Sequence, residues 1–394
     1  MAKQAFPDAK VGEKFNANFI SYQTDAEKGE GIDVAKKYAV TAYPTSLYVP
    51  GNGELLHWAV GYGGISGILT EADKAIAAAK EPRPIAVWEK EYAAGKRDST
   101  FLLGYLTKRA SIGMPNGKAL ENYLVAIPAS DWTADKNVEA ISGNLTTTNT
   151  KAYQVLYNHM MKIRMANQPR YQHMMTSFRS ASRADYDRAV ASRDASQLEH
   201  LVANERRHIA AMLLTDPTPT ELEQFAGMGF RMQFYKIVKD WSTYRRLAMA
   251  QATELMLLPM DSIEAKDKAA HQLFLAQTAS TPDSIKNQAD FKKYAEEMKH
   301  AEALKMAMTL NGLAMTYCEN MTDPADLKQD LTWSTRMVEL DPKPAFLDTH
   351  AQLLAKLGRK AEAAVVEQDA LTKAKAAGEG TADYEKALAE MQKK

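Results

Sequence analysis

The residue types and spacings closest to a metal site are two Glu-x-x-His pairs, Glu205 with His208 and Glu297 with His300. On a helix this spacing places both side chains on one face, as in di-iron carboxylate bundles. Those sites also need a glutamate from each of two further helices, and residues 140–198 contain no glutamate. The ligand set is incomplete, so we expect no metal site. We interpret the pairs as side chains on solvated helix faces.

The glycine-rich segment 61–67 is a second candidate, because glycine loops bind phosphate through their backbone N–H groups. Its spacing does not fit G-x-G-x-x-G, since Ser66 occupies the third glycine position, and no Lys-Ser/Thr pair follows. Ser66 is not the centre of a G-x-S-x-G nucleophile motif either, because Ile68 occupies the last position. We therefore interpret this segment as the exit of a strand.

Cysteine chemistry is limited by the presence of a single cysteine, Cys318. With no second cysteine, the sequence holds no intramolecular disulfide, no C-x-x-C redox couple and no site in which several thiolates bind zinc. We interpret Cys318 as a small buried apolar residue within the stretch 313–321. We also expect no cofactor.

Between residues 151 and 208 the chain has ten Lys and Arg against five Asp and Glu. Five aromatic residues alternate with these charges, namely Tyr153, Tyr157, Tyr171, Phe178 and Tyr186. Such a stretch could stack on and neutralise single-stranded nucleic acid. However, aromatic residues at helical spacing usually form a core with arginines at its solvated edge, and the whole chain has 49 basic and 49 acidic residues. We expect protein or peptide partners and no nucleic acid.

The composition is that of a globular protein, with 394 residues of which 45% are hydrophobic and 25% charged. At about 150 residues per domain, this length predicts two to three domains, or one domain and a helical array. The apolar runs are far shorter than the roughly 20 residues that cross a bilayer, so we expect no membrane span. The first ten residues lack the apolar stretch of a secretory signal.

The predicted secondary structure that positions these groups changes near residue 80. Before it, the pattern predicts strands at 19–22 and 46–49, helices at 34–38 and 66–79, and an antiparallel hairpin in which 55–60 follows the turn 50–53. Glu81-Pro82-Arg83-Pro84 reads as a stiff linker, because each proline fixes its own φ. We therefore expect one domain at 1–80 and another at 85–394.

Residues 85–394 are predicted to be almost entirely helical, which makes the fold class α+β with a larger all-α region of helical hairpins. Helix starts are indicated at Thr218-Pro219-Thr220-Glu221, Thr281-Pro282 and Asp323-Pro324, where a capping residue precedes a proline. From about 332 to 375, two helices with a break at Gly358 resemble a tetratricopeptide repeat. No regular 34-residue period precedes that unit, so we expect a degenerate array.

The first 80 residues resemble the second half of a thioredoxin domain. Five pieces carry the resemblance in order and spacing, namely Phe19 to Asp25, Val34 to Val40, Tyr43 to Val49, Gly51-Asn52-Gly53 and Gly61. The most specific piece is Val40-Thr41-Ala42-Tyr43-Pro44-Thr45, which is similar to the cis-proline loop of that family. Met1-Ala2-Lys3, Phe6-Pro7-Asp8 and Val11-Gly12 are similar to the segment that follows the C-x-x-C of secreted thioredoxin-like proteins.

The resemblance implies that the Tyr43-Pro44 bond is cis and that Tyr43, Pro44 and Thr45 bind substrate, with the backbone of Tyr43 pairing with an extended peptide. It further implies that the chain begins just after the redox cysteines and lacks the strands before them, so no catalytic residue is expected within it. The first 80 residues would then hold a three-stranded remnant of the sheet. A periplasmic or secreted parent is implied as well.

Two functions follow as expectations. The complete parent is a thiol-disulfide oxidoreductase acting on protein disulfides, and this chain is inactive because it lacks the redox pair. The alternative is a non-catalytic scaffold, in which the helical hairpins of residues 85–394 present a surface to another protein.

Overall fold

The computed structural model describes residues 5–38, 40, 43–212 and 226–393. Their contacts divide the chain into two units, 1–238 and 239–394. The expected boundary between residues 80 and 85 does not coincide with this division and stays a prediction. The predicted helix start at Thr218 to Glu221 lies outside the described residues, as do Met1 to Lys3 and the loop residues Thr41 and Ala42.

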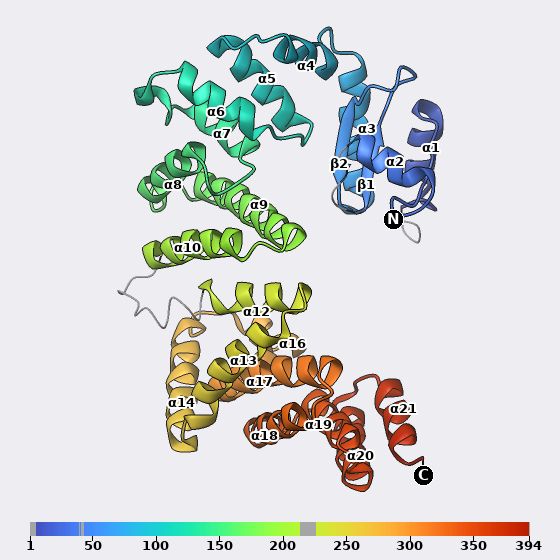
Figure 1. Cartoon of the computed structure of the whole chain (residues 1–394), viewed down its shortest axis with the longest axis vertical. Coiled ribbons are helices and arrows are strands. Elements are labelled where there is room, and N and C mark those ends of the chain that lie inside the picture. The colour runs from blue at the N-terminus through green and yellow to red at the C-terminus, as the bar shows by residue number, and fades with distance from the viewer. Residues whose placement is uncertain (1–4, 39, 41–42, 213–225, 394) are drawn as a thin grey trace. The chain divides into compact units, whose positions relative to one another are not determined.

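The first unit begins with a small α+β segment, shown in blue in Figure 1. Its elements are α1 (Ala9–Asn18), α2 (Glu30–Lys37), β1 (Thr45–Tyr48), β2 (His57–Val60) and α3 (Gly64–Ala79). The strands β1 and β2 form an antiparallel hairpin in which Thr45 lies opposite Val60 and Tyr48 opposite His57. The turn between them closes where the Gly53 N–H donates to the Pro50 carbonyl at 2.9 Å. The predicted hairpin and the helices on either side of it are confirmed.

The strand predicted at residues 19–22 is wrong, and the sheet has two strands rather than three. Phe19 ends α1 in an extended conformation, but a β-strand also needs a neighbour to take its backbone hydrogen bonds. No strand lies beside this segment among the described residues, and Ile20 and Tyr22 are exposed. Residues 19–22 therefore follow α1 without belonging to a sheet.

The rest of the first unit is helical. Its elements are α4 (Ile85–Ala93), α5 (Ser99–Ser111), α6 (Gly117–Ala126), the 3₁₀ turn η1 (Ala129–Asp131), α7 (Asp135–Asn144), α8 (Lys151–Ile163), α9 (Gln168–Ser192), α10 (Ala195–Met212) and α12 (Met228–Ile237). Side-chain caps start several of them: the Asp98 carboxylate accepts from the Phe101 N–H at 2.9 Å, and Asn116 accepts from Ala119 at 2.9 Å. Each cap satisfies a backbone donor that the first helical turn leaves unpaired.

The core of this helical part is formed by one face each of α5 to α9. Tyr105, Tyr123, Leu156 and Met174 are each at most 2% exposed. The aromatic residues of the basic stretch 151–208 belong to this core or its continuation, since all five are buried. The interpretation of these aromatic residues as core is confirmed, and their rings are not presented for stacking on a nucleic acid.

The second unit consists of helices, coloured yellow to red in Figure 1. They are α13 (Trp241–Leu257), α14 (Met260–Gln277), α15 (Asp283–Lys286), α16 (Ala289–Glu297), the 3₁₀ turn η2 (Met298–His300), α17 (Ala301–Asn320), α18 (Pro324–Leu340), α19 (Pro344–Lys356), α20 (Lys360–Ala377) and α21 (Ala382–Met391). From α17 to α21 each helix packs against the next, with short turns between them.

The predicted helix starts and breaks in this unit are largely confirmed. Asp323 caps α18 by accepting from the Ala325 N–H at 2.8 Å, and Pro324 occupies the first turn. The start predicted at Thr281 is displaced by one residue, since Pro282 is the residue before α15. The break between α19 and α20 falls at Gly358, whose φ of 81° is unfavourable for residues with a side chain.

Candidate functional site

The three residues predicted to bind peptide lie together at the start of β1. The Tyr43-Pro44 peptide bond is cis, as expected. The Tyr43 side chain is 56% exposed. The Pro44 carbonyl accepts from the Gly61 N–H at 2.7 Å, which ties the loop to the end of β2. Tyr43 is therefore exposed at the surface, and the backbone of Pro44 is held in place by its hydrogen bond with Gly61.

One edge of β1 has no partner strand among the described residues, because β2 is its single neighbour. The carbonyls of Pro44 and Tyr48 accept hydrogen bonds on the β2 side, from Gly61 and Leu56. Backbone groups alternate in direction along a strand, so those of Leu47 face the opposite edge. This edge can accept an extended chain by main-chain pairing.

A hydrogen-bonded pair of side chains joins the hairpin to the following helix. His57 on β2 is 3% exposed, and its Nε2 lies 2.6 Å from Oε2 of Glu71 on α3. Burial opposes ionisation of Glu71, but hydrogen bonds from Lys74 and His57 outweigh it and hold the Glu71 pKa below its usual value. Burial, aided by the charge of Glu71, raises the pKa of Tyr48 to about 12. The pair joins β2 to α3.

The two Glu-x-x-His pairs are placed differently. Glu297 and His300 lie at the end of α16 and in η2, and Glu297 has an ion pair with Lys343 at 3.3 Å. Glu205 and His208 lie in α10, where His208 is only 6% exposed. The interpretation of both pairs as solvated was therefore wrong for His208. Within the described ranges, no three His, Cys, Asp or Glu side chains come together as a metal site.

The sequence contains a signal for the burial of His208. Leu198, Leu201, Glu205 and His208 follow the 3–4–3 spacing of one helix face, and both leucines are at most 1% exposed. The pair thus continues the buried face of α10 rather than its solvated side. The sequence does not show which helix packs against this face.

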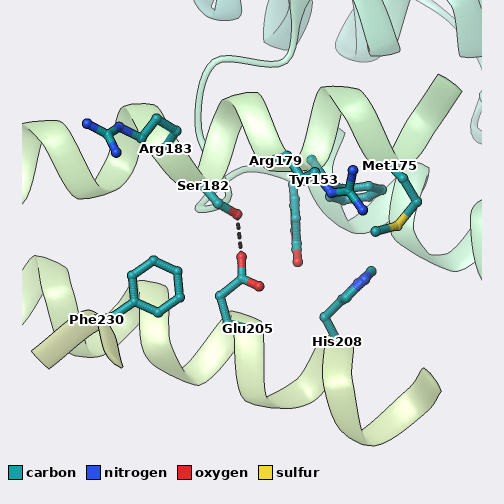
Figure 2. Close-up of a pocket in the computed structure, with 9 residues that line it drawn as sticks. Tyr153, Met175, Arg179, Ser182, Arg183, Glu205, His208 and Phe230 are labelled. Carbon is teal, nitrogen blue, oxygen red and sulfur yellow. Dashed lines mark hydrogen bonds between the residues drawn. The ribbon is translucent and has the colours of Figure 1, made fainter. Parts of the chain in front are cut away.

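That face contributes to a pocket of about 370 Å³ between α9 and α10. Figure 2 shows α9 on one side, α10 on the other, Tyr153 entering from α8 and Phe230 from α12. The lining residues are Tyr153, Met175, Phe178, Arg179, Ser182, Arg183, Glu205, His208 and Phe230. Pockets of roughly 300–1,000 Å³ with apolar walls and a few polar groups are typical ligand sites.

The polar groups of this pocket are only partly satisfied. Ser182 on α9 donates a hydrogen bond to Glu205 on α10. The Nε2 of His208 is buried and has no hydrogen-bond partner in the described part of the chain. The His208 ring lies against Tyr157 and Phe178, with centroids 5.9 and 6.0 Å away.

The environment sets the charge state of the pocket. Burial lowers the pKa of His208; the nearby Glu205 opposes this and Arg179 adds to it. Burial, then the charge of Glu205, raises the pKa of Tyr153. His208 is therefore neutral and Tyr153 protonated at neutral pH. The fixed charges are the Glu205 carboxylate and the guanidinium groups of α9.

Two carboxyl residues of the second unit are completely buried. They are Asp330 on α18 and Glu367 on α20. Among the described residues, neither carboxyl oxygen of Asp330 has a hydrogen-bond partner, whereas Glu367 neighbours the side chain of Asp348. Burial raises the pKa of Asp330 to about 8 against an opposing effect of Lys356. Burial and the neighbouring Asp348 raise the pKa of Glu367 to about 8. Both are favoured in the protonated form by the fold.

Cys318 lies on α17 and is partly buried rather than fully buried as expected. Burial raises the pKa of its thiol above the usual value. A raised pKa reduces the thiolate fraction, which is the reactive form. Its backbone carbonyl accepts a hydrogen bond from Lys356. These features favour a structural role for Cys318.

Comparisons of the chain with protein-family models, with curated proteins and with solved structures found no match. Within the described residues, no helix combines the length and apolar character needed to cross a membrane.

Proposed function

We propose that residues 1–80 are part of a thioredoxin-like domain and bind an extended peptide at Tyr43, Pro44 and Thr45. The observation that carries this proposal is the exposed Tyr43 at the start of a strand that has no neighbouring strand on one edge among the described residues. The thiol-disulfide oxidoreductase activity implied by the resemblance needs a dithiol, which this sequence does not hold. For the chain itself the proposed function is therefore peptide binding.

Main-chain pairing supports binding with little side-chain specificity. No described residue forms a hydrogen bond with the backbone of Tyr43, and the backbone of Leu47 faces the same open edge. A peptide strand placed there would gain hydrogen bonds of about 1 kcal/mol each. Its alternate residues would face the protein, as in other cases of strand addition.

Fluorescence polarisation with labelled unfolded peptides tests the proposal. Tyr43→Pro removes the backbone N–H at this position, whereas Tyr43→Ala removes the side chain and keeps the N–H. If main-chain pairing carries binding, Tyr43→Pro weakens it about fivefold or more and Tyr43→Ala has a smaller effect. Circular dichroism verifies that both variants are folded.

N-methylated peptides give a second test that leaves the protein unchanged. N-methylation at every second peptide residue should abolish binding in one register and leave it nearly unchanged in the other, because strand donors alternate in direction. Equal sensitivity in both registers, or equal effects of Tyr43→Pro and Tyr43→Ala, would contradict main-chain pairing at this edge.

A second candidate is a non-catalytic scaffold, favoured by the sequential packing of α17 to α21. The resemblance of residues 332–375 to a tetratricopeptide repeat supports it, since such hairpins bind other proteins on a concave surface. Crosslinking of a bound partner to the whole chain distinguishes the two candidates. Crosslinks on α17 to α20 that persist in Tyr43→Pro favour the scaffold, and crosslinks confined to residues 43–60 favour the peptide-binding loop.

A further inference from the structure

The pocket between α9 and α10 has an electrostatic polarity. Figure 2 shows Arg179 and His208 at one end, and Arg183, Ser182, Glu205 and Phe230 at the other, with Tyr153 between them. Arg179 is exposed and forms no ion pair with a described residue. Arg183, one turn further along α9, is instead paired with Asp187 at 3.0 Å. Among the described residues, the pocket charges without an ion-pair partner are therefore Arg179 at one end and Glu205 at the other.

Several polar atoms in the pocket lack a hydrogen-bond partner among the described residues. The buried Nε2 of His208 has none, and Figure 2 shows its ring directed into the space between the two helices. Glu205 uses one carboxylate oxygen for Ser182. No described residue hydrogen-bonds to its second oxygen or to the Tyr153 hydroxyl. Of these atoms, Nε2 of His208 is buried without a hydrogen-bond partner among the described residues. Leaving such an atom unpaired is costly, and a bound ligand would relieve that cost.

The charges exclude simple ions as good ligands. A monoanion attracted to Arg179 would lie near the Glu205 carboxylate, and a monocation attracted to Glu205 would lie near Arg179. A zwitterion with its two charges a few ångströms apart satisfies both ends at once. The apolar walls, formed by Met175, Phe178 and Phe230, add contact area for a hydrocarbon or aromatic group.

We propose that this pocket binds a free α-amino acid with an apolar side chain. Its carboxylate pairs with Arg179 and accepts from His208 Nε2–H. Its ammonium group donates to Glu205 and to the Tyr153 hydroxyl oxygen. The volume of about 370 Å³ suits a molecule of this size. The assignment is independent of peptide binding at residues 43–45.

Isothermal titration calorimetry of the whole chain tests the assignment, with L-phenylalanine, L-methionine and L-leucine as probes. At least one of them should show saturable binding. For the amino acid that binds, the analogue without the ammonium group and the analogue without the carboxylate should each bind about tenfold more weakly or worse. For phenylalanine these are 3-phenylpropionate and 2-phenylethylamine.

Three variants assign the two charges. Arg179→Gln should weaken the amino acid about tenfold and leave the amine analogue unaffected, and Glu205→Gln should weaken the amino acid while improving the carboxylate analogue. Arg170→Gln is the matched control, because Arg170 lies on the same helix outside the pocket lining and is paired with Asp135 at 2.5 Å. It should change affinity less than about twofold. Absence of binding by all three amino acids at millimolar concentration, or equal binding of an analogue with a single charge, would overturn the assignment.

Discussion

The imidazole of His57 on β2 lies 2.6 Å from the carboxylate of Glu71 on α3. This contact joins the hairpin that presents the loop 43–45 to the helix that closes the α+β segment. The histidine side chain is 4% exposed and the glutamate side chain 27%. The contact therefore lies largely out of water, where a hydrogen bond to a charged group is stronger than at the surface.

Replacing Glu71 with glutamine should destabilise the α+β segment by about 1–2 kcal/mol at neutral pH, because the buried His57 loses its charged partner. The folded pKa of Glu71 is below its usual value of 4.5. Its contribution is therefore present above that value and is lost as the pH falls through the lowered pKa. Thermal unfolding followed by circular dichroism should show the difference between wild type and variant at pH 7 and a smaller one near pH 3.

Asp73→Asn is the control for this prediction. Asp73 lies on the same helix and pairs with Lys14 at 2.5 Å, but its side chain is 62% exposed. Its replacement should cost less than about 0.5 kcal/mol. An equal effect of the two substitutions would show that the His57 contact carries no special stability.

Asp330→Asn should stabilise the second unit at alkaline pH. The Asp330 carboxyl ionises near 3.8 when unfolded and near 8 when folded. Stability is therefore fully present below about pH 4 and decreases as the pH rises towards 8. Asparagine removes this loss, so the variant should exceed wild type by about 2 kcal/mol or more at pH 8 and by little at pH 4.

Hydrogen exchange of the α18 amides measures the stability of that helix directly. Asp369→Asn on α20 serves as a control, since Asp369 is exposed and paired with Lys373 at 2.7 Å. It should change stability by less than about 0.5 kcal/mol at either pH. A pH-independent effect of Asp330→Asn would mean that the folded carboxyl is ionised across this range.

Gly143→Ala should disrupt the packing of α5 against α7. A Cβ at Gly143 would lie 2.5 Å from the Cβ of Ala110, closer than two carbon atoms can approach. We expect a loss of about 1–3 kcal/mol, the usual cost of overpacking. In the double variant with Ala110→Gly the clash is absent, so the stability should be largely restored. Urea denaturation of the four members of this double-mutant cycle measures the coupling; simple additivity would refute the contact.

Asp185→Ala should release the turn that precedes α8. The Asp185 carboxylate accepts from the Thr147 hydroxyl at 2.7 Å and from both the backbone N–H and the hydroxyl of Thr148, at 2.6 and 2.7 Å. Loss of these bonds should cost about 2–3 kcal/mol and speed amide exchange in residues 145–150. Asp187→Ala, two residues along the helix and exposed, should leave that exchange unchanged.

Local patterns predicted most of the elements because their causes lie within a few residues. The strand alternation around the turn 50–53 predicted the hairpin, and Gly358 marked the break between α19 and α20. The aromatic spacing from Tyr153 to Tyr186 indicated a core. The prediction of a strand at residues 19–22 was wrong because a strand-like run forms a strand only beside a neighbouring strand. Whether that neighbour is present depends on the whole sheet.

The candidate pocket was out of reach of local patterns for a related reason. Glu205 and His208 showed their spacing on α10, and their alignment with Leu198 and Leu201 indicated a buried face. The sequence of α10 does not indicate that Arg179 and Ser182 of α9 lie opposite this face. Charge and hydrogen-bond complementarity between helices arises from tertiary packing. The interpretation of the Glu-x-x-His pair as solvated considered one helix alone and did not include this packing.

The single, partly buried thiol gives the molecule a built-in reporter. Cys318 is the one cysteine of the sequence and lies in the second unit, so a thiol reagent modifies the native chain at one position, without mutagenesis. Because burial raises its pKa, modification should be slow until α17 opens. The rate of labelling by a fluorescent maleimide would then follow the opening of the helix that carries Cys318.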